Sequence, residues 1–333
     1  MNDAGHTWAI VLAAGEGTRL RSLTTTSTGE SVPKQYCSLR GGPSLLHEAL
    51  QRAHSVADRS RICTIVASQH QQWWESALWS MPRSNLIVQP ENRGTGVGVL
   101  LPLLHILERD PQAHVVLLPS DHHVRDEHVL SRSLQRAVEQ LRTRRREIVL
   151  LGLEPEDADP ELGYIEPGDE DGLGARRVRR FVEKPSAAAA RELIAAGALW
   201  NVFILAARAQ SLLELFVMRH TDTVAALTDV VVYDAEHPSM PKAAQRVYRT
   251  LPQIDFSRHV LQGWESALRV LKTPACGWSD LGTPERVGRT LLRVQAREAY
   301  TPQARGDLAG HLSLATQHLL QQSARVGSHA ARP

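Results

Sequence analysis

Short apolar runs alternate with longer amphipathic stretches along residues 1–153. Runs of four to eight apolar residues are typical of strands buried on both faces, and apolar positions three and four apart are typical of helices. We expect strands at 8–14, 62–67, 86–89, 114–121 and 148–153. We expect helices between them at 45–56, 71–78, 95–108 and 129–142. This alternation predicts an α/β fold with a Rossmann-like, doubly wound, mostly parallel sheet.

The pattern changes after residue 153. Two short apolar segments, 163–166 and 178–183, flank the acidic, glycine-rich turn DEDGLG, which predicts an inserted β-hairpin. Beyond it we expect a helix at 186–197, strands at 199–206 and 267–272, and helices from Pro284 onward.

Composition and charge exclude several classes of protein. The 38 basic and 36 acidic residues give a net charge of +2, which is too balanced to imply a polyanionic partner. The three cysteines, Cys37, Cys63 and Cys276, form no CxxC pair, so neither a disulfide framework nor a zinc site is expected. The apolar run at 8–14 is too short to span a membrane and follows no basic segment. We therefore expect a cytoplasmic protein with no nucleic-acid partner and no membrane partner.

A glycine-rich turn, AAGEGTRL at 13–20, follows the first predicted strand. Such a turn can present backbone N–H groups to a phosphate. The dinucleotide fingerprint GxGxxG is not met, because Leu20 stands at the third glycine position, and no P-loop Gly-Lys-Ser/Thr follows. Arg19 instead offers a planar, permanently charged group to phosphate oxygens. From the glycines alone, a phosphate loop and a plain tight turn are equal alternatives.

Further short motifs follow in a fixed order. They are PKQY at 33–36, QPENRGTG at 89–96, LPSDH at 118–122, GYIE at 163–166, FVEKP at 181–185, Trp200-Asn201 and GWSDLGT at 277–283. With the glycine turn, this series resembles the sugar-phosphate nucleotidyltransferases, and among them the mannose-1-phosphate guanylyltransferases. The resemblance covers 1–290 and implies one domain, with an NTP-binding half at 1–153 and a sugar-binding part at 154–290. We expect a helical tail with a frayed end at 291–333, and no C-terminal isomerase half.

The resemblance also implies roles for individual residues. Arg19 and Lys34 would hold the triphosphate and the departing pyrophosphate, and Lys184 the sugar phosphate. Asp121 and Asp280 would share Mg²⁺, a hard cation suited to carboxylates and phosphate oxygens. The expected nucleotide contacts are Leu12, Ala13, Ala14, Gly15, Gly17, Thr18, Gln89, Glu91, Arg93, Gly94, Thr95 and Ser120. The expected sugar contacts are Gly163, Glu183 and Asn201.

Two histidines, His122 and His123, follow Asp121 directly. Adjacent residues of a strand point to opposite faces, so the two rings are not expected to bind one metal ion together. We expect them to pack or to support neighbouring groups.

The expected reaction joins GTP and mannose 1-phosphate to give GDP-mannose and pyrophosphate. Two polyanions must meet, so cationic groups and a divalent ion have to offset their repulsion. The sugar phosphate is itself an anion, so no protein nucleophile is required.

Several alternatives stay open. Asn92-Arg93-Gly94-Thr95 stands where the guanylyltransferases usually have Gly-Arg-Asn-Thr. This difference leaves the base open, so one alternative is an enzyme that uses UTP or dTTP with a hexose 1-phosphate. Another is an inactive paralogue that senses sugar nucleotides, although the five expected charged site residues are all present. PKQY also resembles the cytidylyltransferase of isoprenoid synthesis, but the later sugar-pocket motifs do not resemble that enzyme. A nicotinamide oxidoreductase is disfavoured by the failed glycine fingerprint. A homodimer is the oligomeric state that we consider as an alternative to a monomer.

Overall fold

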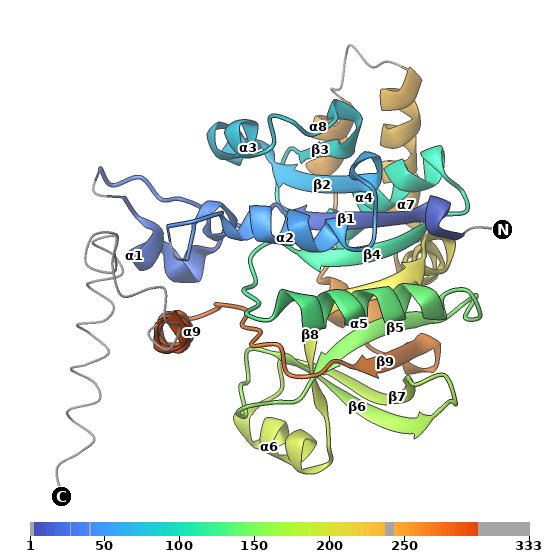
Figure 1. Cartoon of the computed structure of the whole chain (residues 1–333). Coiled ribbons are helices and arrows are strands. Elements are labelled where there is room, and N and C mark those ends of the chain that lie inside the picture. Colours follow the sequence, from blue (N-terminus) through green and yellow to red (C-terminus); the bar gives the residue numbers. More distant parts are fainter. Residues whose placement is uncertain (1–2, 27, 40, 237–242, 299–333) are drawn as a thin grey trace, which may run out of the picture.

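A mixed sheet of nine strands runs through the computed structural model, which describes residues 3–26, 28–39, 41–236 and 243–298 (Figure 1). The strand order is β3-β2-β1-β4-β8-β5-β9-β7-β6. The strands are β1 (Thr7–Ala13), β2 (Ile62–Ala67), β3 (Leu86–Gln89), β4 (His114–Pro119), β5 (Ile148–Leu153), β6 (Gly163–Glu170), β7 (Arg176–Glu183), β8 (Leu199–Arg208) and β9 (Leu268–Lys272).

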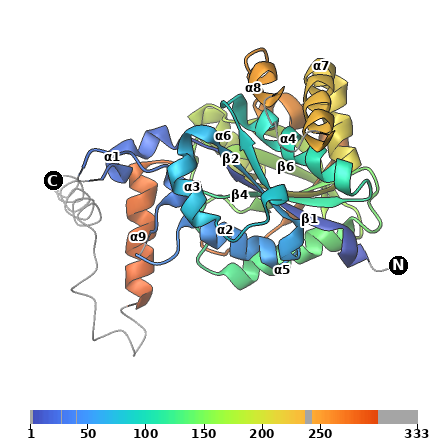
Figure 2. The same ribbon diagram turned by 90° about the horizontal axis from the view of Figure 1, so that it is seen from above.

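Helices cover both faces of the sheet (Figure 2). They are α1 (Arg21–Thr24), α2 (Leu45–His54), α3 (Gln71–Ala77), α4 (Gly94–Arg109), α5 (Glu127–Gln140), α6 (Ala187–Ala195), α7 (Ala209–Glu236), α8 (Ala243–Tyr248) and α9 (Pro284–Glu298). Alternate residues of β1 enter opposite cores: Trp8 and Ile10 join the core under α4 and α7, and Ala9 and Val11 the core under α2 and α5. This two-sided burial confirms the α/β layering that the apolar runs predict.

The sheet is mixed rather than mostly parallel. Strands β3, β2, β1 and β4 run parallel to one another, but β8 lies antiparallel between β4 and β5. An apolar run buried on both faces indicates a central strand but carries no information about its direction. The predicted α/β class is confirmed. The prediction of a mostly parallel sheet holds for β3, β2, β1 and β4 but not for β8, β6 and β7, which pair antiparallel.

The predicted hairpin is present as β6 and β7. Strand β6 pairs with β8 as well as with β7, so β8, β5, β9, β7 and β6 close into a ring. In β8, residues 199–201 pair with β6 and residues 205–208 pair with β4. The strand therefore carries the chain from the hairpin part into the parallel half of the sheet.

Helix α9 crosses residue 290 and packs against the N-terminal half. Its Val287 and Leu291 join Leu20, Leu45 and Leu281 in a small apolar cluster. The rest of the predicted tail, 299–333, lies outside the described residues.

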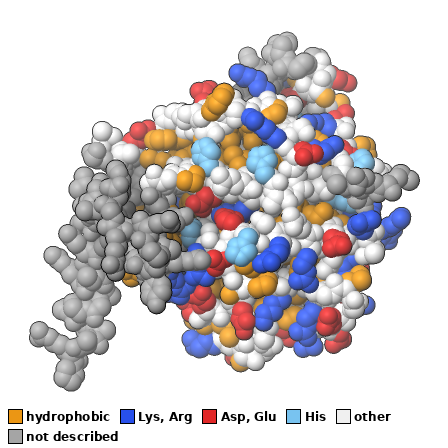
Figure 3. Space-filling view, in the orientation of Figure 1, with side chains coloured by type: hydrophobic (Ala, Val, Ile, Leu, Met, Phe, Trp, Pro, Cys, Tyr) orange, Lys and Arg blue, Asp and Glu red, His pale blue; other side chains and the backbone are white. Residues whose placement is uncertain are grey.

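The surface agrees with the balanced composition. On the face shown in Figure 3, basic and acidic side chains are interspersed rather than segregated. Among the described residues, no helix is both long and apolar enough to cross a membrane.

The start of α4 lies very close to residues 253–256. The N–H of Gly96 donates to the carbonyl oxygen of Ile254 over 2.7 Å. Gly94 has φ +84°, and a Cβ at this position would lie 2.4 Å from the same oxygen. Glycine is thus required here both for its backbone angle and for the close approach of a second chain segment.

We expect Gly94→Ala to lower the free energy of unfolding by roughly 3 kcal/mol or more, because it adds a backbone clash to the cost of a left-handed alanine. Gly29→Ala is the matched control, since Gly29 has φ +85° with no atom near its would-be Cβ. That control should lose only about 1 kcal/mol. Urea unfolding of both variants measures the difference, and equal losses would contradict the assigned role of the Ile254 contact.

Candidate active site

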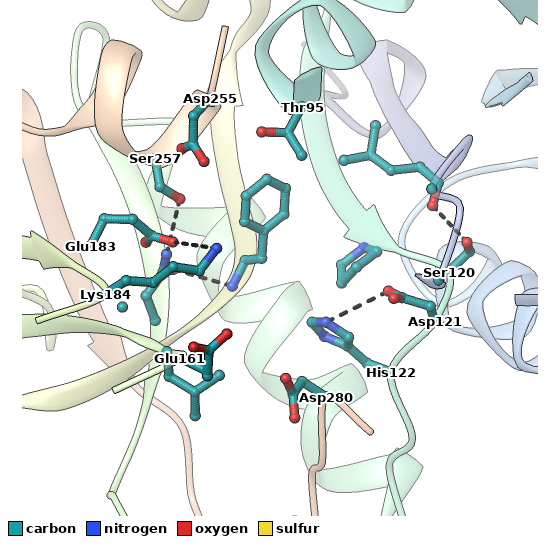
Figure 4. A pocket seen from close by; sticks show the side chains of 18 of the residues that line it. Thr95, Ser120, Asp121, His122, Glu161, Glu183, Lys184, Asp255, Ser257 and Asp280 are labelled. Atoms are coloured by element: carbon teal, nitrogen blue, oxygen red, sulfur yellow. Dashed lines mark hydrogen bonds and ion pairs between the residues drawn. The ribbon is translucent and has the colours of Figure 1, made fainter. Parts of the chain in front are cut away.

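A cavity of about 280 Å³ opens where the carboxyl ends of β1 and β4 face β6, β7 and β8 (Figure 4). Its wall on the β1 and β4 side includes Leu12, Ser120 and Asp121. A second hollow of about 480 Å³ adjoins it and shares Gly17, Arg19 and Asp121 with it. Ligands of open α/β sheets commonly bind at the carboxyl ends of the strands, so this is the expected place for a site.

The glycine-rich turn is held against the turn formed by residues 33–36. The side-chain amide of Gln35 donates to the carbonyl oxygens of Ala13 and Gly15, each over 2.9 Å. Gly17 has φ +60°, and a Cβ there would lie 3.0 Å from the Cβ of Lys34. The backbone of the turn is therefore fixed before any ligand arrives.

Lys34 is buried and holds three acceptors together. Its ammonium lies 2.9 Å from Oδ2 of Asp121, 2.6 Å from the carbonyl oxygen of Asp280 and 3.4 Å from that of Leu281. An ammonium has three N–H donors, and these contacts use all of them. Lys34 thus joins the end of β4 to the turn at 279–282.

Asp121 and His122 stand together at the end of β4. Burial opposes ionisation of Asp121, but the ammonium of Lys34 and the neighbouring His122 lower the pKa of this carboxyl below its usual value. Burial lowers the pKa of His122 to about 4, against the attraction of Asp121. The site therefore holds an ionised carboxylate beside a neutral imidazole at neutral pH.

Asp280 lies on the same cavity as Asp121. Its Oδ1 accepts from the N–H of Gly282 over 3.2 Å and lies 2.8 Å from Arg286, which also contacts Asp159 at 3.0 Å. In proteins, Mg²⁺ is typically held by one or two carboxylates together with water and substrate phosphates. Two carboxylates on one cavity fit that requirement, although the described residues contain no cluster of three or more His, Cys, Asp or Glu that could hold a metal ion.

The opposite wall is formed by polar side chains of β7 and β8 and by the segment after α8. Asn201 donates to Oγ of Ser257 over 3.5 Å, and the ammonium of Lys184 lies 3.9 Å from Oε1 of Glu183. Burial, together with the nearby carboxylate of Asp255, raises the pKa of Glu183 to about 7. Figure 4 shows Glu183, Lys184, Asp255 and Ser257 facing the Asp121 wall across the cavity.

Gly163 lies between two of these side chains. It pairs with Glu183 across β7 and with Asn201 across β8. A Cβ at this position would lie 2.6 Å from Oε2 of Glu183. A side chain at 163 would therefore displace the Glu183 carboxylate.

Backbone strain is concentrated around the cavity and the adjoining hollow. In the described part of the chain, the non-glycine residues with positive φ are Lys184 (49°), Phe203 (58°) and Leu281 (48°). Lys184 and Phe203 line the cavity, and Leu281 lines the hollow. Strained backbone of this kind often accompanies functional sites, where the surrounding structure holds it in place.

Most of the residues predicted for the site line the cavity. They are Leu12, Gly15, Gly17, Arg19, Thr95, Ser120, Asp121, Gly163, Glu183, Lys184, Asn201 and Asp280. Thr18 and Lys34 line the adjoining hollow.

The remaining predicted residues are Ala13, Ala14, Gln89, Glu91, Arg93 and Gly94, which are not among the described residues lining either space. Gln89 is only 2% exposed, and Glu91 forms an ion pair of 2.7 Å with Arg93. In this structure the side chains of Gln89 and Glu91 do not reach the cavity, so their assignment to the nucleotide base stays a prediction.

Several cavity residues were not predicted as contacts. They are Gln35, Pro119, His122, Glu161, Leu162, Phe203, Asp255, Ser257 and Trp278. Glu161 accepts a 2.7 Å hydrogen bond from Arg19 across the mouth of the cavity. Trp278 lies within the GWSDLGT motif and Gln35 within PKQY, so those motifs could have indicated them. Asp255 and Ser257 lie in a segment without any motif.

The chain is similar in sequence to a known protein family and to several known proteins. The sequence profile of the family described as Nucleotidyl transferase matches residues 8–294. The xanthan biosynthesis protein XanB of Xanthomonas campestris pv. campestris (strain ATCC 33913) is 28% identical over 306 residues, covering 90% of this chain and 62% of XanB. Mannose-1-phosphate guanylyltransferase 2 of Escherichia coli O157:H7 is 27% identical over 289 residues, covering 83% of this chain and 58% of that protein.

A solved structure is also similar. It is the crystal structure described as a mannose-1-phosphate geranyltransferase from Thermus thermophilus, with a TM-score of 0.71 and 26% identity. The match covers 86% of this chain and 79% of that one. By contrast, the chain spans about 60% of the length of the two curated relatives.

The raised pKa of Glu183 predicts a pH-dependent stability. The folded pKa of about 7 lies above the ordinary value of 4.5, so the fold favours the protonated carboxyl. This contribution is complete below pH 4.5 and is lost as the pH rises through 7. Glu183→Gln keeps the neutral form, so the variant should be more stable than the native protein at pH 8, by up to about 3 kcal/mol, and similar to it at pH 4.5.

Chemical unfolding between pH 4.5 and pH 8 measures this difference. Glu192→Gln on the exposed side of α6 is the control and should follow the native curve. A constant difference between Glu183→Gln and the native protein at all pH values would show that Glu183 does not titrate in this range.

Proposed function

The chain belongs to the nucleotidyl transferase family, and from that premise we propose that it joins a sugar 1-phosphate to a nucleoside triphosphate with release of pyrophosphate. We further propose that the substrates are GTP and mannose 1-phosphate, that the enzyme is Mg²⁺-dependent, and that it acts in the cytoplasm.

One observation carries the proposal: opposite charges from distant segments meet at one cavity. Arg19 and Lys184 line the same space as Asp121 and Asp280. A reaction between two polyanions needs cations on both sides of the reacting phosphorus and carboxylates for a divalent ion. An inactive sensor of sugar nucleotides would not need the two carboxylates.

The two walls divide the work between the substrates. Arg19 and the backbone of residues 12–17 would hold the triphosphate, and Lys184 would hold the sugar phosphate. An oxygen of the sugar phosphate attacks the α-phosphorus in line, the bond from this phosphorus to the bridging oxygen breaks, and pyrophosphate leaves with the electron pair. Bound Mg²⁺, held by Asp121 and Asp280, would neutralise phosphate charge. Positioning supplies much of the rate.

Arg19 must change partners for this role. Its guanidinium is bonded to Glu161 across the cavity mouth, and both side chains are about half exposed. An exposed ion pair of this kind is weak, so a triphosphate can displace Glu161 at small cost.

Glu183 and Asn201 would bind sugar hydroxyls from the opposite wall. The choice of mannose and of GTP rests on the motif resemblance and on the similarity to a mannose-1-phosphate guanylyltransferase. Because Gln89 is buried, base recognition in this conformation would depend on Thr95 and on backbone groups of residues 12–15.

A pyrophosphate-release assay tests the proposal. GTP, UTP, dTTP, CTP and ATP are each paired with mannose 1-phosphate and glucose 1-phosphate in the presence of Mg²⁺. We expect kcat/KM for GTP with mannose 1-phosphate to exceed that of every other pair by at least about 30-fold, or ~2 kcal/mol. Equal rates with UTP or dTTP would overturn the guanylyl assignment, and no release with any pair would overturn the enzymatic one.

We expect Asp121→Asn and Asp280→Asn each to lower turnover at least about 100-fold, or roughly 2.7 kcal/mol of transition-state stabilisation, because each removes a charge that would hold the metal ion. Titration with Mg²⁺ measures the loss, and thermal unfolding checks that the variants are folded. Asp157→Asn is the control, since Asp157 pairs with Arg289 at the surface and should leave turnover unchanged. Full activity of either test variant at ordinary Mg²⁺ would remove that residue from the metal site.

A further inference from the structure

His122 stands between the two carboxylates proposed to hold the metal ion. It follows Asp121 directly at the end of β4, and Figure 4 shows its ring between Asp121 and Asp280 on the cavity wall. Its side chain is 12% exposed. The ring is thus mostly buried and still reaches the cavity.

The indole of Trp278 fixes the orientation of this ring. Its Nε1–H donates to Nδ1 of His122 over 3.2 Å, and the two rings meet edge to face with centroids 5.2 Å apart. Trp278 is buried and packs in turn against Trp200 of β8, with ring centroids 6.1 Å apart.

This contact determines which imidazole nitrogen carries the proton. An indole N–H can only donate, so Nδ1 of His122 must present a lone pair. The ring hydrogen is therefore on Nε2. A hydrogen on Nδ1 would point at the indole N–H and break the contact.

The Nε2–H group is directed to Asp121. Nε2 lies 3.7 Å from Oδ1 of Asp121, while Oδ2 of the same carboxylate lies 2.9 Å from the ammonium of Lys34. Both oxygens thus have a donor group beside them. The longer separation exceeds a hydrogen bond, and a small rotation of the Asp121 side chain would close it.

We propose that Trp278 and His122 act as a positioning pair: the indole N–H fixes the Nε2–H tautomer of His122, and this N–H orients the Asp121 carboxylate toward a divalent cation. The second half of the proposal rests on the metal site of the proposed function. The first half concerns the protein alone. Partners of this kind commonly fix the orientation of metal-binding carboxylates.

The tautomer is tested first, in metal-free protein. NMR with ¹⁵N-labelled histidine distinguishes the two tautomers by the shifts of Nδ1 and Nε2. We expect His122 to be protonated at Nε2 in the native protein and to become a mixture of tautomers in Trp278→Phe, which keeps a ring but lacks the N–H. Trp200→Phe, which alters only the neighbouring indole, should leave the His122 signals unchanged. A proton on Nδ1 in the native protein would overturn the proposal.

Binding of Mn²⁺ alone, followed by electron paramagnetic resonance of the free ion, tests the second half. We expect Kd to rise about five- to tenfold in Trp278→Phe and in His122→Leu. His122→Gln places an amide donor at a reach similar to Nε2 and should bind Mn²⁺ nearly as the native protein does. An unchanged Kd in His122→Leu, or no Mn²⁺ binding by the native protein, would overturn the orienting role.

These measurements do not depend on turnover. Failure of the proposed function would appear as no pyrophosphate release from any substrate pair. Failure of the positioning pair would appear in the tautomer or in Mn²⁺ affinity while that release persists. The His122 variants keep the test decisive should Trp278→Phe fail to fold.

Discussion

The candidate site depends on one buried ammonium. Lys34 bonds the side chain of Asp121 and the backbone carbonyls of Asp280 and Leu281, which lie far apart in the sequence. A buried cation is strongly unfavourable unless its donors are satisfied, so these segments must come together if the lysine is to be buried at all. The glycine turn is drawn into the same arrangement, because Gly17 lies directly against Lys34.

Charge is divided between two walls that the fold brings face to face. The wall near β1 and β4 carries Asp121 with a lowered pKa, and the wall near β7 and β8 carries Glu183 with a raised one. Burial raises the pKa of both carboxyls, but at Asp121 the ammonium of Lys34, 2.9 Å away, outweighs it. At Glu183 the carboxylate of Asp255 adds to the effect of burial, and Lys184 lies 3.9 Å away. Asp121 is therefore ionised and can bind a cation. Glu183 can gain or lose a proton near neutral pH, so it can donate or accept a hydrogen bond with a ligand.

Strain and close packing mark the same region. Phe203 has positive φ in β8, between the part that pairs with β6 and the part that pairs with β4. This is where the parallel half of the sheet meets the closed ring of the hairpin part. Gly163 and Gly94 each admit a neighbour that a side chain would exclude. The cavity is thus built at the junction of two sheet geometries, and its walls have little freedom to relax.

The sequence alone determined the α/β class, most strands and helices, the hairpin and many of the residues that line the cavity. These follow from local apolar periodicity and from motifs whose residues act close to their own strand ends. Tertiary structure decided the direction of β8, the long helix α7 with its non-helical His220, and the entry of Asp255 and Ser257 into the cavity. It also decided that Gln89 is buried and that Lys34 bonds three protein acceptors. Each of these depends on which distant segment a residue contacts. The local sequence around a buried strand, or around a single carboxylate in a loop, does not indicate which segment that will be.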